Sequence, residues 1–564
     1  MIPVVQMEEE YFRWLGEAGR DEDVIKELKD MEGDACKIQD AFYKNLEFGT
    51  GGLRGGIGAG TNRMNVYTVA KATQGYADYL KKNFPIEKRM AAISFDSRIK
   101  SELFAKTAAE VLAANGVRVL IFRELMPTPC LSYAVRQLGC AGGIMVTASH
   151  NPAQYNGYKV YGADGGQITD TAAAQILSDI DKTDVLNGAE RIAFEEGLVS
   201  GTIQFIGDDV IDAYIGSVKS LSLAEQEMGR EDMSIVYSPL NGTGRVPVFR
   251  CLRECGFRKI TMVKEQEYPD GTFPTCPYPN PEEKDAMALG IEYGKRVNAD
   301  LVLATDPDCD RVGIAVKKHE NEYTLLSGNE TGILLFDYIC SQRLAQGKMP
   351  EDPVAVKTIV TTEMARAVAQ DYGVRLINVL TGFKYIGEQI TQLEKSGRGD
   401  SYIFGFEESY GYLSGTHVRD KDAVNASLLI CEMFAHYKEK GISLIDRLTQ
   451  LFLKYGYWVN TLHSIRMEGA DGMAKMQEIM EKFRAGVDEF AGYKVAECTD
   501  YAEGINGLPK SNVLQFRLEN QCSVVIRPSG TEPKLKIYIS ACAGTKELAE
   551  RAAEDVKKFV IRFC

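Results

Sequence analysis

One pattern occurs three times in the chain and restricts its fold more than any other feature. An apolar, strand-like segment at 90–96, 234–240 and 354–360 precedes a helical stretch that ends in glycine. A second apolar strand follows each glycine, within 113–122, 253–263 and 369–379, and a third occupies 142–149, 299–306 and 401–408. Strands that alternate with helices favour mainly parallel sheets, and glycine suits a helix C-terminus. The repeat therefore predicts three related α/β domains.

The two ends of the chain depart from this pattern. From about Tyr457 onward, a strand-like segment, a helical run near 472–486, the strand "SVVIRP" and a terminal helix at 546–562 predict a smaller α+β domain. Roughly the first 40 residues resemble charged amphipathic helix, expected to cover the first domain. A chain of 564 residues is too long for one core. We therefore expect four domains, at 1–207, 208–322, 323–454 and 455–564.

Charge and cysteine usage exclude several classes of protein. The net charge of −14 argues against a nucleic-acid partner, which needs surplus Lys and Arg, but allows a small anionic ligand in a local basic pocket. Thirteen scattered cysteines without a C-x-x-C pair indicate reduced thiols in the cytosol. Neither a secretory leader nor a run of about 20 apolar residues is found. We expect a cytoplasmic protein with no membrane partner.

The segment "ATDPDCDRVG" places Asp306, Asp308 and Asp310 at every other position. In an extended segment, alternate side chains face one way, so the three carboxylates can converge on one Mg²⁺. An EF-hand loop would need glycine sixth and glutamate twelfth, where this chain has Arg311 and Lys317. A merely solvated acidic turn is less favourable, because three carboxylates without a cation repel one another. The spacing predicts a metal site.

Two other loops carry groups suited to a sugar phosphate. Glu407 and Ser409 leave a predicted strand end together and could grip sugar hydroxyls, although ordinary turn polarity explains them equally well. In "VIRPSGTEPKLKIY", two cations and a tight turn could cradle a phosphate dianion, whereas a plain hairpin would need neither cation. The residues of this phosphate cradle are Arg527, Ser529, Gly530, Thr531 and Lys536.

Two loops near the N-terminus remain ambiguous from their residues alone. The glycines around Arg54 fit neither the dinucleotide fingerprint nor the P-loop, but they allow that arginine to approach an anion closely. Ser149 in "TASHNP" follows a strand, where a turn residue or helix cap is the common explanation. No G-x-S-x-G motif occurs, and the adjacent His150 is a poor base for a Ser-His dyad.

Four loops together resemble one family. "TASHNP", "DPDCDR", "GFEES" and "RPSGTEP" occur in this order over nearly the whole chain and are similar to the loops of the α-D-phosphohexomutase superfamily. "GFEESYGYL", "VRDKDAV" and "LTGFKYIG" resemble most closely the bacterial α-phosphoglucomutase branch, which is also similar to phosphopentomutase-type phosphoglucomutases.

The resemblance implies a phosphomutase that interconverts α-D-glucose 1-phosphate and glucose 6-phosphate through glucose 1,6-bisphosphate. Ser149 would carry the phosphoryl group and complete the Mg²⁺ shell of the three aspartates, and the bisphosphate would turn end for end between two transfers. The other residues implied are Lys159 as general acid/base, Arg54 beside the phosphoserine, Arg311 as phosphate anchor, His417 as an acid/base or phosphate contact, and Thr381, Gly382, Lys384, Glu407 and Ser409 for the sugar. Cys309 replaces the glycine of the commoner metal loop, which suggests an oxidation-sensitive thiol.

Alternative functions remain compatible with the sequence. A phosphopentomutase or phosphomannomutase would use the same scaffold, because epimeric sugars differ by one hydroxyl and sequence spacing does not place a hydroxyl contact. A metal-dependent sugar phosphatase with Asp306 as nucleophile would need neither Ser149 nor the phosphate cradle. A non-catalytic sugar-phosphate sensor would be expected to lack Ser149 or one of the aspartates, and the chain retains them all.

Overall fold

The structure is a computed structural model that describes residues 4–49, 51–224, 229–319, 322–467, 469–505, 507–529 and 534–563. The chain divides into two compact units. Unit 1 contains Met1–Leu325, Gly387–Gly399 and Gly411–Glu432, and unit 2 contains Leu326–Ile386, Asp400–Tyr410 and Met433–Cys564. Within the described residues, no helix combines the length and the apolarity needed to cross a membrane.

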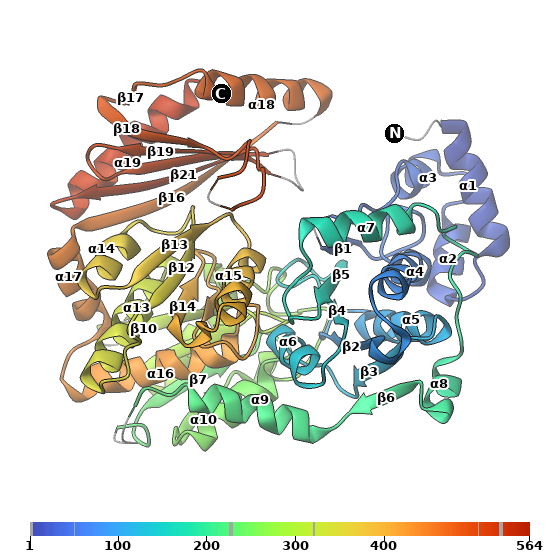
Figure 1. Ribbon diagram of the computed structural model, residues 1–564, viewed down its shortest axis with the longest axis horizontal. Coiled ribbons are helices and arrows are strands. Elements are labelled where there is room, and N and C mark those ends of the chain that lie inside the picture. The colour runs from blue at the N-terminus through green and yellow to red at the C-terminus, as the bar shows by residue number, and fades with distance from the viewer. Residues whose placement is uncertain are drawn as a thin grey trace. The chain divides into compact units, whose positions relative to one another are not determined.

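The three repeats fold as predicted (Figure 1). Their first strands are β2 (Met90–Phe95), β7 (Ser234–Ser238) and β12 (Val354–Thr358); their second are β3 (Arg118–Phe122), β8 (Lys259–Met262) and β13 (Arg375–Val379); their third are β4 (Gly142–Val146), β9 (Leu301–Thr305) and β14 (Tyr402–Phe406). In each repeat the first strand lies between the other two and is parallel to both. Gly116, Gly256 and Gly373 end the preceding helices with φ of 72°, 92° and 66°.

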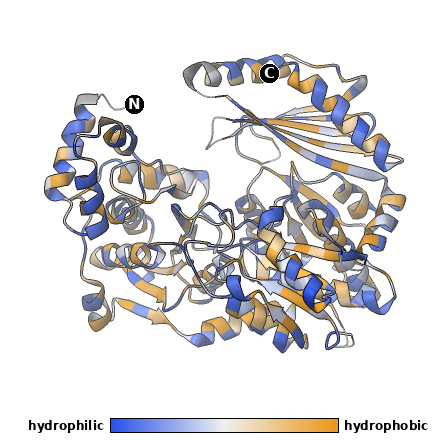
Figure 2. Ribbon diagram, turned by 180° about the vertical axis from the view of Figure 1, so that it is seen from behind, coloured by the Kyte–Doolittle hydropathy of each residue, from blue (hydrophilic) through white to orange (hydrophobic). Residues whose placement is uncertain are grey.

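The first sheet, in unit 1, has the strand order β1-β5-β4-β2-β3-β6. The added strands are β1 (Gly52–Gly56), β5 (Tyr155–Gly162) and β6 (Ile203–Ile206), and the helices are α4 (Val66–Asn83), α5 (Ser101–Ala114), α6 (Thr128–Gln137), α7 (Asp170–Ile180) and α8 (Phe194–Ser200). Every residue of β4 is buried, as expected of a central parallel strand covered on both faces. The apolar colour of such strands is visible in Figure 2. β1 and β5 are antiparallel, so the sheet is mixed.

Three short helices precede the first sheet. They are α1 (Val4–Glu17), α2 (Glu22–Asp30) and α3 (Ala35–Phe42), and the side chains of Asp21 and Asp34 cap the last two. Tyr11, Trp14 and Leu28 lie in the same hydrophobic cluster as the first sheet. The predicted cover of the first domain is therefore confirmed.

The second sheet, also in unit 1, has the order β11-β10-β9-β7-β8. Its further elements are β10 (Val312–His319), β11 (Glu322–Leu326), α9 (Asp208–Ser220), α10 (Arg245–Glu254), α11 (Lys264–Glu267) and α12 (Lys284–Val297). β10 returns antiparallel to β9, so the loop between them, which holds the three aspartates, turns tightly at the carboxyl end of β9.

Unit 2 contains the third parallel core and the C-terminal sheet. Helices α13 (Gly328–Ala345), α14 (Met364–Asp371) and α17 (Leu444–Tyr455) accompany β12 to β14. The short strand β15 (Tyr412–Leu413) is assigned to unit 1, and α15 (Phe383–Lys395) and α16 (Ala423–Glu439) each contain residues of both units.

The C-terminal sheet has the order β16-β21-β20-β19-β18-β17. Its elements are β16 (Tyr457–Arg466), α18 (Gly469–Arg484), β17 (Glu489–Phe490), β18 (Tyr493–Asp500), β19 (Leu514–Leu518), β20 (Ser523–Pro528), β21 (Lys534–Ala543) and α19 (Lys546–Ile561). Residues of α18 and α19 share one core with this sheet, which confirms the predicted α+β domain.

Candidate functional site

Ser149 lies in the loop after β4 and is buried, with 4% of its surface exposed. Its Oγ donates a hydrogen bond to Oδ2 of Asp306 over 2.8 Å. The same oxygen lies 3.1 Å from Nδ1 of His150, so the neighbour that the sequence presents as a poor partner is within hydrogen-bonding distance. Burial, followed by the charges of Arg311 and Arg54, lowers the pKa of His150 well below its usual range.

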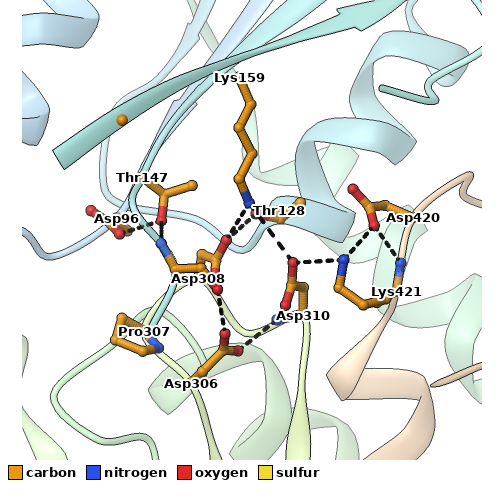
Figure 3. A network of polar contacts seen from close by, with 12 residues as sticks. Asp96, Thr128, Thr147, Lys159, Asp306, Pro307, Asp308, Asp310, Asp420 and Lys421 are labelled. Carbon is orange, nitrogen blue, oxygen red and sulfur yellow. Dashed lines mark hydrogen bonds and ion pairs between the residues drawn. The ribbon is translucent and has the colours of Figure 1, made fainter. Parts of the chain in front are cut away.

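The three aspartates converge after β9, as the alternating spacing predicts. Each offers a carboxylate oxygen, all within 4.8 Å of one another, and all three side chains are buried. Oδ1 of Asp306 accepts hydrogen bonds from the backbone N–H groups of Asp310 and Arg311, which closes the loop. Oδ1 of Asp308 and Oδ1 of Asp310 are buried without a hydrogen-bond partner. Figure 3 shows the three carboxylates pointing toward a common space.

This arrangement fits a divalent cation. Burial and the neighbouring charges of Asp308 and Asp310 raise the pKa of Asp306 well above its usual range, so the cluster resists full ionisation by itself. A bound hard cation would instead lower the pKa of these carboxyl groups, and the two unpartnered oxygens could serve as its ligands. The carboxylate set is therefore suited to bind a metal ion.

Two lysines flank the carboxylates (Figure 3). Nζ of Lys159, on β5, lies 3.0 Å from Oδ2 of Asp308 and 3.9 Å from Oδ2 of Asp310. Nζ of Lys421 lies 3.1 Å from Oδ2 of Asp310 and 2.9 Å from Oδ1 of Asp420. Sequence reasoning named Lys159 but missed the contact of Lys421, although that residue lies within the "VRDKDAV" segment used for the resemblance.

The two arginines named from the sequence are also found near the aspartates. Nη1 of Arg311 pairs with Oε1 of Glu282 at 3.0 Å. Arg54 lies on the edge strand β1 opposite Gly157 of β5, and its charge interacts with those of Asp308 and Asp310. Both arginines belong to unit 1 with Ser149, Lys159 and the three aspartates.

His417 lies in unit 1 in a buried polar contact. Its Nε2 lies 2.8 Å from Oδ2 of Asp422, whose Oδ1 accepts a hydrogen bond from the hydroxyl of Tyr214. The ring of His417 stacks on Tyr214 with centroids 6.2 Å apart. Nδ1 of His417 is buried without a hydrogen-bond partner, so in this structure the described contact of the ring is made through Nε2 alone.

Cys309 does not match the expected reactive thiol. Its side chain is fully buried, and burial, with the charge of Asp306, raises the pKa of the thiol well above its usual range. Its φ of 52° lies in the left-handed region that glycine adopts freely, which explains why a turn of this kind accepts glycine. The suggestion of an oxidation-sensitive thiol is wrong for this conformation, because a buried thiol remains protonated and inaccessible.

Unit 2 holds the residues predicted to contact the sugar. Glu407 follows β14 and is buried, and its Oε1 accepts a hydrogen bond from the backbone N–H of Gly382 over 3.0 Å. The loop after β14 is thus joined to the loop after β13, which carries Thr381 and Lys384. Nζ of Lys384 lies 4.9 Å from the ring centre of Tyr385. Ser409 is two residues beyond Glu407 in the same loop.

The described residues of the phosphate cradle lie on or directly next to β20 and β21 in unit 2. Arg527 and Lys536 are directly opposite each other in the antiparallel ladder, so their side chains emerge on the same face of the sheet. The N–H of Ser529 donates to the carbonyl of Lys534 over 2.8 Å. Gly530 and Thr531 lie outside the described residues.

Sequence reasoning missed further polar residues around Ser149. Oγ1 of Thr128 donates to Oδ2 of Asp308 over 3.0 Å, and Oγ1 of Thr147 accepts from the backbone N–H of Ser149 over 2.7 Å. Asp96 and Arg98 contact the Ser149 loop from the loop after β2. The only available signal was their position after predicted strands, where ligands gather in parallel sheets.

Comparisons with known proteins agree with this architecture. The chain matches the four domains of phosphoglucomutase/phosphomannomutase: alpha/beta/alpha domain I over residues 45–186, domain II over 212–320, domain III over 327–455 and the C-terminal domain over 465–558. It is 34% identical over 532 residues to a phosphoglucomutase of Staphylococcus saprophyticus, covering 92% of this chain and 94% of that protein. A phosphoglucomutase of Staphylococcus aureus is 34% identical over 553 residues, covering 95% and 97%.

Solved structures show the same fold at lower identity. The open form of parafusin, a phosphoglucomutase from Paramecium, has a TM-score of 0.70 at 19% identity, covering 92% of this chain and 95% of that chain. A phosphoglucomutase/phosphomannomutase family protein from Burkholderia thailandensis has a TM-score of 0.68 at 17% identity, covering 92% and 97%. Because all four domains match and the 34% identity extends over 92% of this chain, the chain belongs to the phosphoglucomutase/phosphomannomutase family.

Proposed function

We propose that the protein interconverts α-D-glucose 1-phosphate and glucose 6-phosphate by way of a phosphoserine at position 149. One observation carries this proposal: a buried serine hydroxyl is hydrogen-bonded to a buried carboxylate cluster that is suited to a metal. The curated relatives named phosphoglucomutase support glucose as the sugar. A phosphatase with Asp306 as nucleophile would leave this serine without a role.

The three aspartates and Ser149 are the proposed ligands of Mg²⁺. When bound, the ion would neutralise charge on the phosphoryl oxygens. Arg54 and Arg311 are proposed to contribute positive charge around the same phosphoryl group. Phosphoryl transfer depends mainly on such alignment and charge neutralisation, because the transition state offers little covalent chemistry to the protein.

Each transfer breaks one phosphorus–oxygen bond and forms another. The bond between Ser149 Oγ and phosphorus breaks as the 6-hydroxyl oxygen of glucose 1-phosphate bonds to that phosphorus. Lys159 is proposed as the general acid/base, with His417 as a further candidate: the 6-hydroxyl gives up its proton as it attacks, and Ser149 Oγ takes up a proton as its bond to phosphorus breaks. The product, glucose 1,6-bisphosphate, turns end for end and returns its 1-phosphate to Ser149, which leaves glucose 6-phosphate.

Residues of unit 2 are proposed to hold the sugar phosphate at its other end. Glu407 and Ser409 would bind sugar hydroxyls, with Thr381, Gly382 and Lys384 in the neighbouring loop. Arg527, Ser529, Gly530, Thr531 and Lys536 would bind the phosphate that is not being transferred. We further propose the domain limits 1–207, 208–322, 323–454 and 455–564, and a cytoplasmic location in keeping with sugar-phosphate substrates.

The decisive experiment measures the intact mass of the protein before and after treatment with glucose 1,6-bisphosphate, followed by peptide mapping. The proposal expects the gain of one phosphate, located on Ser149. If the protein converts glucose 1-phosphate while no phosphate reaches Ser149, the mechanism is wrong. If Mg²⁺-dependent release of inorganic phosphate is the only reaction, the phosphatase alternative is correct.

A further inference from the structure

Ser149 has an unfavourable backbone conformation. Its φ of 51° lies in the left-handed region, which residues with a Cβ rarely adopt. Such a conformation persists only where its surroundings determine it, and it often marks a functional site. The question is which groups hold this serine in place.

One buried guanidinium binds the backbone on both sides of the serine. Nη1 of Arg98 donates hydrogen bonds to the carbonyls of Pro152 and Tyr155 over 3.0 Å and 3.1 Å. Nη2 donates to the carbonyls of Ser149 and Asn151. The side chain of Arg98 is fully buried. Only arginine offers so many donors in one rigid plane, so a single side chain fixes four carbonyls of this loop.

Asp96 fixes the other side of the same peptide segment. Its Oδ2 accepts a hydrogen bond from the hydroxyl of Thr147 over 2.6 Å, and that hydroxyl oxygen accepts from the N–H of Ser149 over 2.7 Å. Figure 3 shows Asp96 beside Thr147, next to the carboxylate cluster. Oδ1 of Asp96 accepts from the N–H of Arg98 and from the hydroxyl of Ser101. The N–H and the carbonyl of Ser149 are therefore both held through buried groups.

A segment before the second sheet's β9 covers this arrangement. The guanidinium carbon of Arg98 lies 5.0 Å from the ring centre of Phe273. Two residues earlier, a Cβ at Gly271 would lie 2.5 Å from the backbone nitrogen of Ile99. The close approach excludes a larger residue there and shields the hydrogen bonds of Arg98 from water, which strengthens them.

We propose that Arg98 and Asp96 are positioning residues for phosphoryl transfer: they hold the Ser149 loop in the strained conformation that directs Oγ toward Asp306. The inference rests on the proposed role of Ser149 as the phosphoryl carrier. Arg98 and Asp96 act through the backbone and through Thr147. Their effect is on the alignment of the serine oxygen, where a displacement of about 1 Å can cost about 100-fold in rate.

The first test compares Arg98→Lys with Arg89→Lys. Lysine keeps the positive charge beside Asp96 but cannot reach four carbonyls with one planar group. Arg89 is a matched control, because its guanidinium also donates to two backbone carbonyls, those of Phe84 and Lys81, in a different part of the same domain. For Arg98→Lys we expect a loss on the order of 100-fold in single-turnover transfer from phosphorylated Ser149 to the sugar phosphate, with little change in KM.

Hydrogen exchange provides a readout that does not depend on activity. The N–H groups of Asn151 and Tyr155 donate within the loop, to the carbonyls of Ala148 and Pro152. In Arg98→Lys these amides should exchange faster than in the wild type, whereas Arg89→Lys should leave their exchange and the transfer rate unchanged. Faster exchange with unchanged transfer, or unchanged exchange with unchanged transfer, would overturn the proposal.

A second pair of variants decides the matter if Arg98→Lys fails to fold. Thr147→Val removes the hydroxyl that links Asp96 to the N–H of Ser149, and Thr147→Ser restores it. We expect slow transfer in the first and recovery in the second; equal transfer rates in both would contradict the proposal. The two hypotheses fail differently: a wild-type Ser149 that never accepts phosphate removes both, whereas normal phosphorylation with normal transfer in Arg98→Lys and Thr147→Val removes only the positioning role.

Discussion

The Oγ of Ser149 and the Oδ2 of Asp306 are joined by a hydrogen bond of 2.8 Å. Ser149 follows the third strand of the first repeat, and Asp306 follows the third strand of the second repeat. The same position in two related domains thus supplies the candidate nucleophile and the candidate metal ligand. The loops at the carboxyl ends of parallel strands extend beyond the sheet, so their side chains can meet in a shared site.

Ser149→Ala should abolish the interconversion of glucose 1-phosphate and glucose 6-phosphate, because the transferred phosphate has no covalent carrier. The substitution removes one oxygen from a residue whose backbone is held by other groups, so the fold should remain. Ser217→Ala on α9, which also removes a hydrogen-bonded hydroxyl, should keep normal turnover. Full activity in Ser149→Ala, measured by a coupled assay, would be incompatible with the phosphoserine mechanism.

Asp308→Asn should weaken Mg²⁺ binding, because it removes one negative charge from the carboxylate cluster while preserving the shape of the side chain. We expect the dissociation constant to rise by at least about 10-fold, the lower end of what loss of a supporting partner costs a metal site. Binding is measured by calorimetric titration and checked by the Mg²⁺ dependence of activity. Asp300→Asn, at the opposite end of β9, is the matched control and should bind as the wild type does.

The repeated strands were predictable because central parallel strands are buried on both faces and therefore read as continuous apolar runs. β1 was not, because "GLRGG" has almost no apolar residues. Its Gly52 is required by close backbone contact: a Cβ there would lie 2.0 Å from the carbonyl oxygen of Tyr158. A strand of this kind is determined by its neighbour rather than by its own composition.

From residue spacing alone, the candidate site was predictable only where its residues are close in the sequence, whereas Ser149, Lys159 and Arg54 were named from the resemblance. Asp306, Asp308 and Asp310 form one local motif, and the structure brings them together. Lys421 reaches Asp310 from more than a hundred residues away, and the contact of Arg98 with the Ser149 loop spans about fifty residues. Such contacts leave no periodic pattern in the sequence, so they are seen only in the folded structure.

Cys309 should resist thiol reagents in the folded protein, since its raised pKa and full burial keep it protonated and inaccessible. Cys36 and Cys498 are exposed and should react first. Peptide mapping after brief treatment with iodoacetamide distinguishes them, and denatured protein supplies the control in which all three react. Rapid labelling of Cys309 with retained activity would show that the metal loop opens in solution.

Lys357→Met should reverse the pH dependence of stability around β12. Burial alone would raise the pKa of Glu363, but Lys357, whose Nζ lies 2.8 Å from Oε1, and then Arg366 lower that pKa below its usual range. In the wild type, Glu363 therefore stabilises the fold above about pH 4.5, and this contribution is lost only as the pH falls through the lowered pKa. Without Lys357 the buried carboxyl has a raised pKa, so stability should fall as the pH rises above about 4.5.

The expected loss for Lys357→Met near neutral pH is about 3–5 kcal/mol, the usual cost of removing one partner from a buried ion pair. Amide hydrogen exchange of β12 between pH 5 and 7, corrected for intrinsic rates, measures it locally. The double variant Lys357→Met with Glu363→Gln removes both charges and should lose the pH dependence. An equally steep pH dependence in the double variant would show that another group is responsible.

Glu407→Gln should weaken the grip on the sugar without affecting the phosphoserine itself. The amide oxygen can still accept from the N–H of Gly382, so the loop should keep its shape, but the charge available to a sugar hydroxyl is lost. Hydrogen bonds to charged groups contribute about 1.5–3 kcal/mol, so kcat/KM should fall by roughly 10-fold to 100-fold. Hydrolysis of phosphorylated Ser149 by water should stay at the wild-type rate.

Glu408→Gln is the matched control. Glu408 accepts hydrogen bonds from the hydroxyls of Thr358 and Thr361, and the variant should show nearly normal kcat/KM. If kcat/KM falls only in Glu408→Gln, or falls equally in both variants, Glu407 is not the specific contact to the sugar.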